Sequence, residues 1–316
     1  MANFLVTGGA GFIGSNIARY LLNESHSVRV VDNFITGRKR NLEGFYDKID
    51  FIEGDLRNPD IAQKCVADMD YILHQAALPS VPRSVKDPIT SNEMNIDATL
   101  ILLEAARKAK IKRFVYAASS SCYGDQDAPV KSEALLPSPM SPYAVTKVCG
   151  EYYCKAYYIC FGLETISLRY FNVFGPRQDP TSPYGAVIPK FIYAYLYNKQ
   201  PVVFGDGKQT RDFTYVENIV RANLLAAFSK KGVGETLNIA CGTSYSLLQL
   251  LDTLSKITGK KIPPRFDPPR AGDVKHSLAD IQKAKELIGY EVTIPFDEGL
   301  KITWEWFEKN PEHFNA

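Results

Sequence analysis

Tyr143 and Lys147 are four residues apart, so on a helix they would share one face. Ser141 and Pro142 before them are a good N-cap and a proline suited to the first helical position, which predicts that a helix begins here. A tyrosine with a pKa near ~10 is a poor base, and lowering that pKa by about 3 units needs roughly 4 kcal/mol of selective phenolate stabilisation. An ammonium group one turn away could supply part of it. The pair is a candidate proton-transfer site, although the same spacing is common on exposed helix faces.

Hydroxyl side chains follow a strand predicted at 114–117. They are Ser119, Ser120 and Ser121, ahead of Cys122-Tyr123-Gly124. Ligands of parallel sheets bind at the carboxyl ends of the strands. These serines are therefore predicted to lie where they can reach a substrate hydroxyl.

A glycine-rich segment lies between a strand predicted at 4–6 and a helix predicted over 12–22. Its residues are Gly8, Gly9, Ala10, Gly11, Phe12, Ile13 and Gly14. The glycines allow a sharp turn close to phosphates, whose charge meets the free N–H groups of the helix N-terminus. Such turns also close ordinary strand-helix junctions, so the motif alone is weak. Its position nevertheless predicts a pyrophosphate site for a dinucleotide.

Asp32 strengthens that prediction, because it ends a strand predicted at 28–32 and lies 18 residues after Gly14. A carboxylate there accepts hydrogen bonds from both ribose hydroxyls and repels a 2′-phosphate, which favours NAD over NADP. Asn33 next to it belongs to the same predicted site. The basic run at 38–40 could weaken the preference, but it is interpreted as a solvated loop.

Two short segments continue the predicted cofactor site along the sheet. Asp55 and Leu56 follow a strand near 51–52, where a carboxylate and the next N–H can hold the adenine edge. Gln75-Ala76-Ala77 follows the strand predicted at 71–74, and its small side chains would let a cofactor pass close to the backbone.

Apolar strands alternate with helical segments through the first half of the chain, which predicts a parallel sheet covered on both faces. The fold class is α/β, a Rossmann-type doubly wound sheet with a smaller C-terminal substrate-binding lobe. The predicted NAD-binding domain covers 1–172 and also receives 212–243. Segments 173–211 and 244–316, rich in proline and glycine loops, are predicted to form the substrate lobe.

The composition excludes several classes of protein. The 316 residues include 37 Lys plus Arg against 35 Asp plus Glu, mixed along the chain, so a nucleic-acid partner has no electrostatic support. No stretch is apolar enough for a membrane helix and no basic leader opens the chain, so a cytoplasmic protein is expected. The six cysteines show no Cys-x-x-Cys pair, and no metal site is predicted.

Taken in order, the glycine turn, the serine run and Tyr143-x-x-x-Lys147 resemble the extended short-chain dehydrogenase/reductase family. The resemblance continues through 168–172, 205–207 and 211–213 to 270–273. Within that family the chain is most similar to the nucleotide-sugar 4-epimerases, in particular those that act on UDP-N-acetylglucosamine in polysaccharide biosynthesis. The resemblance implies bound NAD and a UDP-sugar substrate.

The resemblance also implies a role for each matching residue. Tyr143 would be the base, Lys147 would bind the nicotinamide ribose and tune Tyr143, and Ser119 would hydrogen-bond the reacting hydroxyl, with its neighbouring serines as alternatives. Asn95 and Phe171 would contact the cofactor. Besides Tyr143 and Ser119, the implied substrate contacts are Ser80, Ser120, Asn172, Ala186, Val187, Phe204, Arg211, Arg270, Asp273 and Ser277.

In related epimerases the position of Ser277 lies beside the C2 substituent of the sugar, where a small side chain leaves room for an N-acetyl group. This predicts that UDP-GlcNAc and UDP-GalNAc are accepted, and UDP-Glc and UDP-Gal with them. Ser277 could equally cap a helix over 278–281. The resemblance further implies a homodimer in which helices 94–109 and 142–159 of each subunit meet, and the aromatic residues of the second helix suit an interface.

Other functions fit parts of the same pattern. A 4,6-dehydratase is disfavoured, because Ser120 and Ser121 stand where that family carries an acidic pair. A UDP-hexuronate 4-epimerase or decarboxylase shares the first oxidation at C4 and stays open. A dehydrogenase that releases NADH, or a non-catalytic NAD-binding protein on the same fold, are the remaining alternatives.

Overall fold

Seven parallel strands form the central sheet of the computed structural model, which describes residues 1–180, 186–269 and 275–314. The strand order is β11-β6-β5-β4-β1-β2-β3. The fold class predicted from the sequence is confirmed. The strands are β1 (Asn3–Thr7), β2 (Ser27–Asp32), β3 (Asp50–Glu53), β4 (Tyr71–His74), β5 (Arg113–Ser119), β6 (Thr165–Tyr170) and β11 (Thr236–Ile239).

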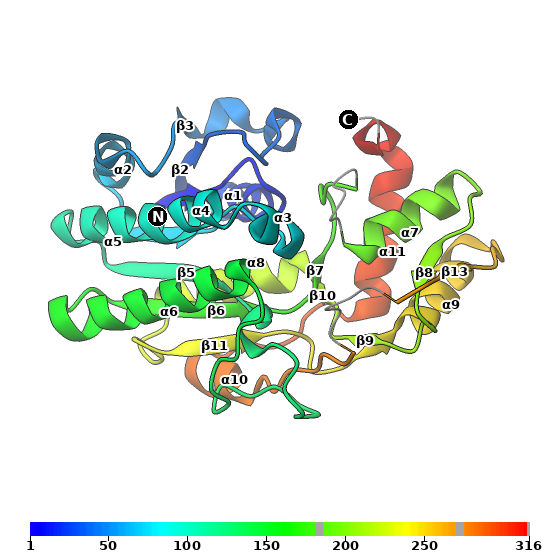
Figure 1. Cartoon of the computed structure of the whole chain (residues 1–316). Helices are drawn as coiled ribbons and strands as arrows, with labels where there is room; N and C mark the ends of the chain where they lie inside the picture. The colour runs from blue at the N-terminus through cyan, green and yellow to red at the C-terminus, as the bar shows by residue number, and fades with distance from the viewer. Residues whose placement is uncertain (181–185, 270–274, 315–316) are drawn as a thin grey trace.

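Helices cover both faces of this sheet (Figure 1). One layer consists of α1 (Phe12–Asn23), α8 (Val216–Phe228) and α10 (Gln282–Ile288). The opposite layer consists of α2 (Pro59–Val66), α5 (Ala98–Lys108) and α6 (Pro142–Phe161), and α3 (Val81–Lys86) and α4 (Pro88–Asn92) pack against α6. Single turns interrupt the connections: η1 (Lys39–Leu42), η2 (Tyr46–Lys48), η3 (Glu93–Asp97), η4 (Ser120–Tyr123) and η5 (Pro311–Phe314).

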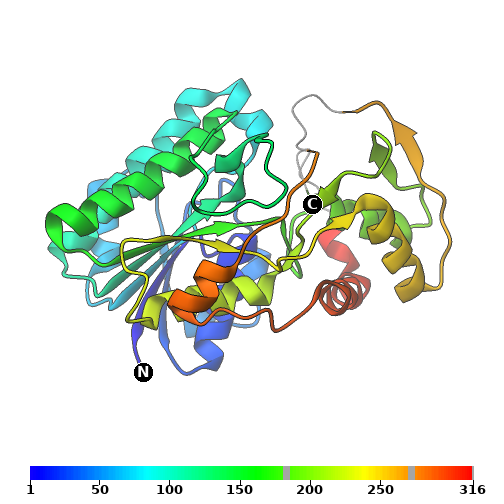
Figure 2. The same cartoon turned by 90° about the horizontal axis from the view of Figure 1, so that it is seen from below.

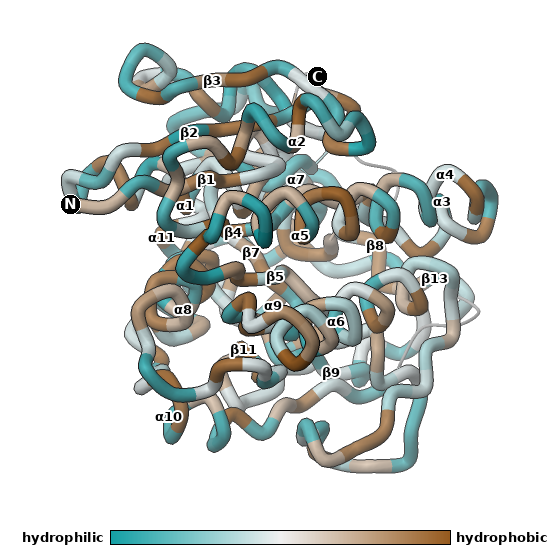
Figure 3. Tube along the Cα trace, turned by 90° about the vertical axis from the view of Figure 1, so that its left-hand side faces the viewer, coloured by the Kyte–Doolittle hydropathy of each residue, from teal (hydrophilic) through white to brown (hydrophobic). Residues whose placement is uncertain are grey.

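Alternate residues of each strand point into two separate hydrophobic cores. In β1, Phe4 and Val6 pack with α1 and α8, whereas Leu5 packs with α2 and α5. All three side chains are fully buried. Hydrophobic segments of β4 and β5 run between the helix layers in Figure 3. Burial on both faces explains why the centre of β1, Phe4-Leu5-Val6, is continuously apolar.

A smaller lobe lies beside the carboxyl ends of the strands, and Figure 2 shows it next to the sheet lobe. Its helices are α7 (Val187–Leu196), α9 (Leu247–Thr258) and α11 (Phe296–Lys309), which share a third core. Its paired strands are β8 (Val202–Phe204) with β13 (Arg265–Asp267), and β9 (Thr210–Arg211) with β12 (Tyr245–Ser246). β7 (Val173–Phe174) pairs with β10 (Thr214–Tyr215), and both strands contact α8.

The chain passes between the lobes more than once. After β6 it enters the smaller lobe, returns as α8 and β11 to the sheet, and leaves again. Segment 212–243 thus contains α8 and β11, which pack with or belong to the sheet. The domain limits inferred from the sequence remain a proposal. The order of the strands reverses between β1 and β4, and ligands of such sheets bind at that switch point.

Candidate active site

The glycine turn joins β1 to α1 and leaves the start of α1 open. Gly8 has φ +62°, a conformation that favours glycine, and a Cβ there would lie 2.8 Å from the Cα of Ala76. A Cβ on Gly14 would lie 2.3 Å from the carbonyl oxygen of Gly8. Gly11 is the N-cap of α1, and no side chain caps the free N–H groups. The turn is therefore packed tightly and presents a helix N-terminus to an anion.

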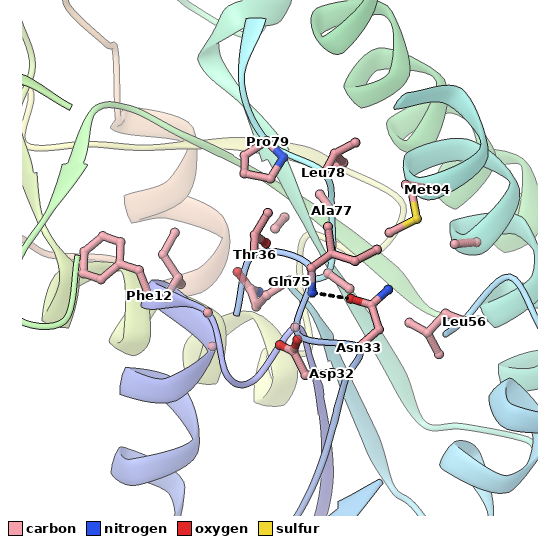
Figure 4. A pocket seen from close by; sticks show the side chains of 18 of the residues that line it. Phe12, Asp32, Asn33, Thr36, Leu56, Gln75, Ala77, Leu78, Pro79 and Met94 are labelled. Carbon is pink, nitrogen blue, oxygen red and sulfur yellow. Dashed lines mark hydrogen bonds between the residues drawn. The ribbon is translucent and has the colours of Figure 1, made fainter. Parts of the chain in front are cut away.

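Asp32 ends β2 and is largely buried, with 8% of its surface exposed. Its carboxylate accepts hydrogen bonds from the backbone N–H of Ala10 (2.9 Å) and of Phe34 (2.8 Å). Burial raises its pKa, and these backbone bonds oppose the rise. Asp32 lines a cavity of about 520 Å³ together with Asn33, Gln75 and Phe12 (Figure 4).

Arg38 and Lys39 are exposed, as expected of a solvated loop, and all three basic residues at 38–40 also contact other parts of the molecule. Arg38 forms an ion pair with Asp179 (3.3 Å), across from β2 at the edge of the same cavity. Arg40 donates to the backbone carbonyl of His313 (3.3 Å). The ammonium of Lys39 lies 5.2 Å from the centre of the Phe34 ring. Long-range contacts of this kind leave no trace in the local sequence.

The carboxyl ends of β3 and β4 complete the wall. Asp55 and Leu56 line the cavity, but the Asp55 carboxylate also accepts from Arg57 (2.8 Å) and Asn33 (3.2 Å). The Arg57 hydrogen bond lowers the Asp55 pKa. Ala76 and Ala77 line the cavity as well, and the Gln75 side chain donates to the hydroxyl of Tyr170 (3.2 Å).

Tyr143 and Lys147 lie on the first two turns of α6 and line the same cavity. The hydroxyl of Ser141 accepts from the N–H of Ala144 (3.2 Å), as the predicted N-cap requires. Lys147 is buried and its ammonium donates to the carbonyl of Ala117 (2.8 Å). The pair is therefore not an exposed surface pair.

Ser119 is the hydroxyl that the fold brings to Tyr143. Burial raises the pKa of Tyr143, and a hydrogen bond with the Ser119 side chain lowers it. The Ser119 oxygen also accepts from the backbone N–H (3.2 Å) and the hydroxyl (2.9 Å) of Ser121. Ser120 starts η4, and none of the three serines lines the cavities that the structure describes. Ser119 is the one hydrogen-bonded to Tyr143, and its contact with the reacting hydroxyl stays a prediction.

A second cavity, of about 220 Å³, lies in the smaller lobe. Five of the predicted substrate contacts line it: Asn172, Ala186, Val187, Phe204 and Arg211. Ser80 lines the first cavity instead, beside Tyr143. Arg270 and Asp273 lie outside the described residues.

Ser277 lies next to this second cavity, within reach of Asn172. The side-chain amide of Asn172 donates to the Ser277 hydroxyl at 3.5 Å, and the Ser277 N–H donates to the carbonyl of Thr210. The alternative role as a helix cap is wrong, because α10 begins only at Gln282, after Ile281. Segment 278–281 is instead paired with Lys131 by an isolated bridge at Ala279, outside the named strands.

Two predicted cofactor residues lie behind the cavity wall. The side chain of Asn95 is buried and bonds the backbone of Leu78 (2.6 Å) and the hydroxyl of Thr146 (3.0 Å). Phe171 is fully buried with its ring 6.1 Å from that of Tyr123. Neither lines the described cavities, and their contact with a cofactor stays a prediction.

Sequence reasoning missed several residues that line the first cavity, among them Met94, Tyr170, Arg177 and Asp179. Arg177 and Asp179 come from the loop after β7, and Arg177 bonds Asn16 of α1 at 3.4 Å. Burial and the nearby Arg19 lower the Arg177 pKa to about 10. Two charged residues in a proline-rich loop were a usable signal, but nothing local said which cavity they meet.

The chain is similar to known proteins over most of its length. The model of the NAD dependent epimerase/dehydratase family matches residues 4–240, more than half of the chain. The chain belongs to that family. The resemblance inferred from the motifs and the prediction of NAD as cofactor are confirmed.

Solved structures of family members are similar over the whole chain. The UDP-N-acetylglucosamine 4-epimerase of Methanobrevibacter ruminantium, in complex with UDP-N-acetylmuramic acid, is 41% identical, with 98% of this chain and 99% of that chain covered and a TM-score of 0.93. The UDP-glucose 4-epimerase of Thermotoga maritima, with UDP-glucose, is 38% identical at 98% and 100% coverage and a TM-score of 0.93. The UDP-glucuronic acid 4-epimerase of Bacillus cereus, with UDP-glucuronic acid and NAD, is 36% identical at 98% and 99% coverage and a TM-score of 0.89.

The residues of the first cavity fit the cofactor of this family. The crowded Gly8 and Gly14 leave the uncapped start of α1 accessible to a pyrophosphate, and Asp32 stands at the end of β2 for a ribose. Within the described ranges, no cluster of His, Cys, Asp or Glu could hold a metal ion. None of the helices described is long and apolar enough to span a bilayer.

Proposed function

We propose that this chain reversibly inverts C4 of UDP-hexoses, with UDP-GlcNAc and UDP-GalNAc among its substrates. The family match and the epimerase relatives support the coarser statement, an NAD-dependent UDP-sugar epimerase. The observation that carries the proposal is that Tyr143 and Lys147 line one cavity with the glycine turn and Asp32. A sugar carbon beside Tyr143 would thereby lie next to the nicotinamide end of a cofactor anchored at α1.

Three side chains would handle the proton on the C4 hydroxyl. Tyr143 would accept it, while Ser119, which is hydrogen-bonded to Tyr143, would orient the same hydroxyl. Lys147 would hold the nicotinamide ribose and place a positive charge near the Tyr143 phenolate that accepts the proton. NAD, held by the glycine turn, Asp32 and Lys147, would supply the hydride acceptor and donor for C4.

The second cavity would take the nucleotide part of the substrate. Arg211 lies at its wall, and a guanidinium is suited to diphosphate oxygens. Phe204 and Val187 offer apolar surface to the uracil ring. Asn172 lines the second cavity and is hydrogen-bonded to Ser277. It would contact the sugar and the diphosphate there.

Ser277 supports acceptance of the acetylated sugars, because its side chain is small and partly exposed. Space by itself argues for tolerance and not for selection, since preference needs contacts to the acetamide. Activity on UDP-hexuronates is the second candidate, because the Bacillus cereus relative at 36% identity is a UDP-glucuronic acid 4-epimerase.

One coupled assay tests these alternatives. Purified protein would be incubated with UDP-GlcNAc, UDP-Glc and UDP-GlcA in turn, and the products separated by chromatography while absorbance at 340 nm is followed. We expect C4 epimers of the first two sugars and no net change at 340 nm, because NAD is regenerated. Turnover of UDP-GlcA alone would replace the proposal by the hexuronate alternative. Net formation of NADH would identify a dehydrogenase.

Ser277→Tyr tests the acetylated substrates separately. The larger ring would exclude the N-acetyl group, so turnover of UDP-GlcNAc should be abolished while UDP-Glc turnover is spared. If the variant keeps its activity on UDP-GlcNAc, Ser277 does not lie beside the C2 substituent.

A further inference from the structure

A buried ion pair lies directly behind the proposed catalytic helix face. Glu151, one turn after Lys147 on α6, accepts two hydrogen bonds from Arg169 of β6, at 2.9 and 2.7 Å. Glu151 and Arg169 are each 4% exposed. The Arg169 guanidinium also lies over the ring of Tyr123, 4.8 Å from its centre. Figure 1 shows α6 running along β5 and β6, and the hydrogen bonds between Glu151 and Arg169 join α6 to β6.

Burial of such a pair needs an explanation other than stability. Removing two charges from water is costly, and well-packed apolar side chains of similar volume often stabilise a core as well or better. The pair is therefore weak support for a purely structural role. Glu151 lies on the same face of α6 as Lys147, which indicates that the Glu151 charge acts on the Lys147 ammonium.

Lys147 is a cation in a site that disfavours charge. It is 4% exposed, and its ammonium lies 5.1 Å from the centre of the Tyr116 ring. Burial lowers the Lys147 pKa to about 8, and the Glu151 carboxylate acts in the opposite direction. Without that carboxylate, a larger fraction of Lys147 would be neutral at working pH.

The other titratable groups around Lys147 and the ion pair carry no negative charge at neutral pH. Burial raises the pKa of the Cys154 thiol of α6 and the Cys122 thiol of η4 to about 12 each. Burial also raises the pKa of Tyr116 of β5 well above its usual value, and that of Tyr143 above it. Burial lowers the pKa of His74 of β4 to about 3, so its ring is neutral. Among the described residues around Lys147, Glu151 is left as the negative charge.

We infer that Glu151 is a positioning residue that keeps Lys147 protonated in the assembled site, and that Arg169 holds the Glu151 carboxylate in place. The inference rests on the proposed role of Lys147 in the epimerase reaction. It adds to that role a counter-charge outside the cavity, since neither Glu151 nor Arg169 lines the described cavities.

Glu151→Gln removes the charge and keeps the shape of the side chain. The titration of Lys147 would be followed by NMR on protein labelled with ¹³C at the lysine ε-carbons, with the resonance assigned by its loss in Lys147→Met. We expect the midpoint in Glu151→Gln to fall by about one pH unit, because the variant loses a negative charge one helix turn from Lys147 and leaves the Arg169 charge unpaired. The alkaline limb of kcat/KM for the sugar should move to lower pH by the same amount.

Two matched variants separate charge from structure. Glu151→Asp keeps the charge but shortens the side chain, so it should retain the wild-type midpoint even if the protein melts earlier. Glu164→Gln removes the carboxylate of a half-exposed pair, with Arg113 (2.7 Å), at the start of β5, and should leave the Lys147 midpoint unchanged. If Glu151→Gln does not fold, Glu151→Gln with Arg169→Met removes both charges and is measured instead, with a smaller fall in the same direction.

The outcomes distinguish this inference from the proposed function. An unchanged Lys147 midpoint in a folded variant without the Glu151 charge overturns the inference, whether or not the protein is active. A lowered midpoint supports it, even in a protein that fails to epimerise every UDP-sugar tested, a result that would overturn the proposed function alone.

Discussion

Gly14→Ala should damage the cofactor site more than Gly11→Ala, although both add one methyl group to the same turn. A Cβ on Gly14 would lie 2.3 Å from the Gly8 oxygen, whereas ordinary contacts begin at 3.4 Å, so the turn must open by about 1.1 Å. At Gly11 the corresponding distance is 3.0 Å, and an opening of about 0.4 Å suffices. Both positions have ordinary backbone conformations, so the clash and not φ decides the effect.

A displacement of about 1 Å of groups that bind a ligand can cost on the order of 10²-fold in function. We expect NAD affinity to fall by about that factor in Gly14→Ala and by clearly less than 10-fold in Gly11→Ala. Helix propensity works against this result, because alanine inside a helix is favoured over glycine by about 1 kcal/mol. A loss in Gly14→Ala therefore reports the clash and not a weakened helix.

The assay is titration of cofactor-stripped protein with NAD in a calorimeter, with circular dichroism to establish that each variant is folded. NAD released from the purified proteins by heat denaturation gives a second, independent measure of occupancy. Wild-type affinity in a folded Gly14→Ala, or equal losses in the two variants, would refute the steric argument.

Three further predictions concern the base, a buried carboxyl and the oligomer. Tyr143→Phe should lower epimerase turnover by at least ~10²-fold with NAD occupancy unchanged, and near-normal turnover would remove Tyr143 as the base. Burial raises the Asp212 pKa from 3.8 to about 7, while the backbone N–H groups of Cys241 and Gly242 oppose the rise. Because the folded-state pKa lies above the unfolded one, this group makes the protein less stable as pH rises from about 4 to 7, by up to ~4 kcal/mol. Urea unfolding of Asp212→Asn should lack that decline and the exposed Asp252→Asn should keep it; parallel curves for both would contradict the assignment. Sedimentation should give twice the monomer mass, with α5 and α6 at the interface, and an active monomer at micromolar concentration would argue against it.

Local patterns in the sequence were enough to predict the sheet and many of the residues that line the first cavity. The strands at 28–32, 71–74 and 165–170 are largely buried, and their order with intervening helices leads to a doubly wound sheet. The glycine turn could be found because its conformations are required locally. The N-cap Ser141 and the start of α6 at Pro142 follow from equally local chemistry.

Contacts between segments far apart in the chain could not be predicted from the sequence. Arg38 forms an ion pair with Asp179, which lies 141 residues further along the chain. The hydrogen bond from the Lys147 ammonium to the carbonyl of Ala117, 30 residues earlier in the chain, was not predicted either. Each of these depends on which loops the fold brings together, and no periodicity or spacing records that.

The late arrival of β11 has a consequence for how the protein is made. β6 is buried along its whole length, yet its outer neighbour β11 begins only at Thr236. On a ribosome that adds about 5–20 residues per second, the interval between the end of β6 at Tyr170 and the end of β11 at Ile239 lasts on the order of 3 to 14 seconds. During that time the apolar edge of β6 has no strand to pair with and is open to pairing with another nascent chain. Yield in a heterologous host should therefore depend on chaperone supply and on translation speed between these two strands.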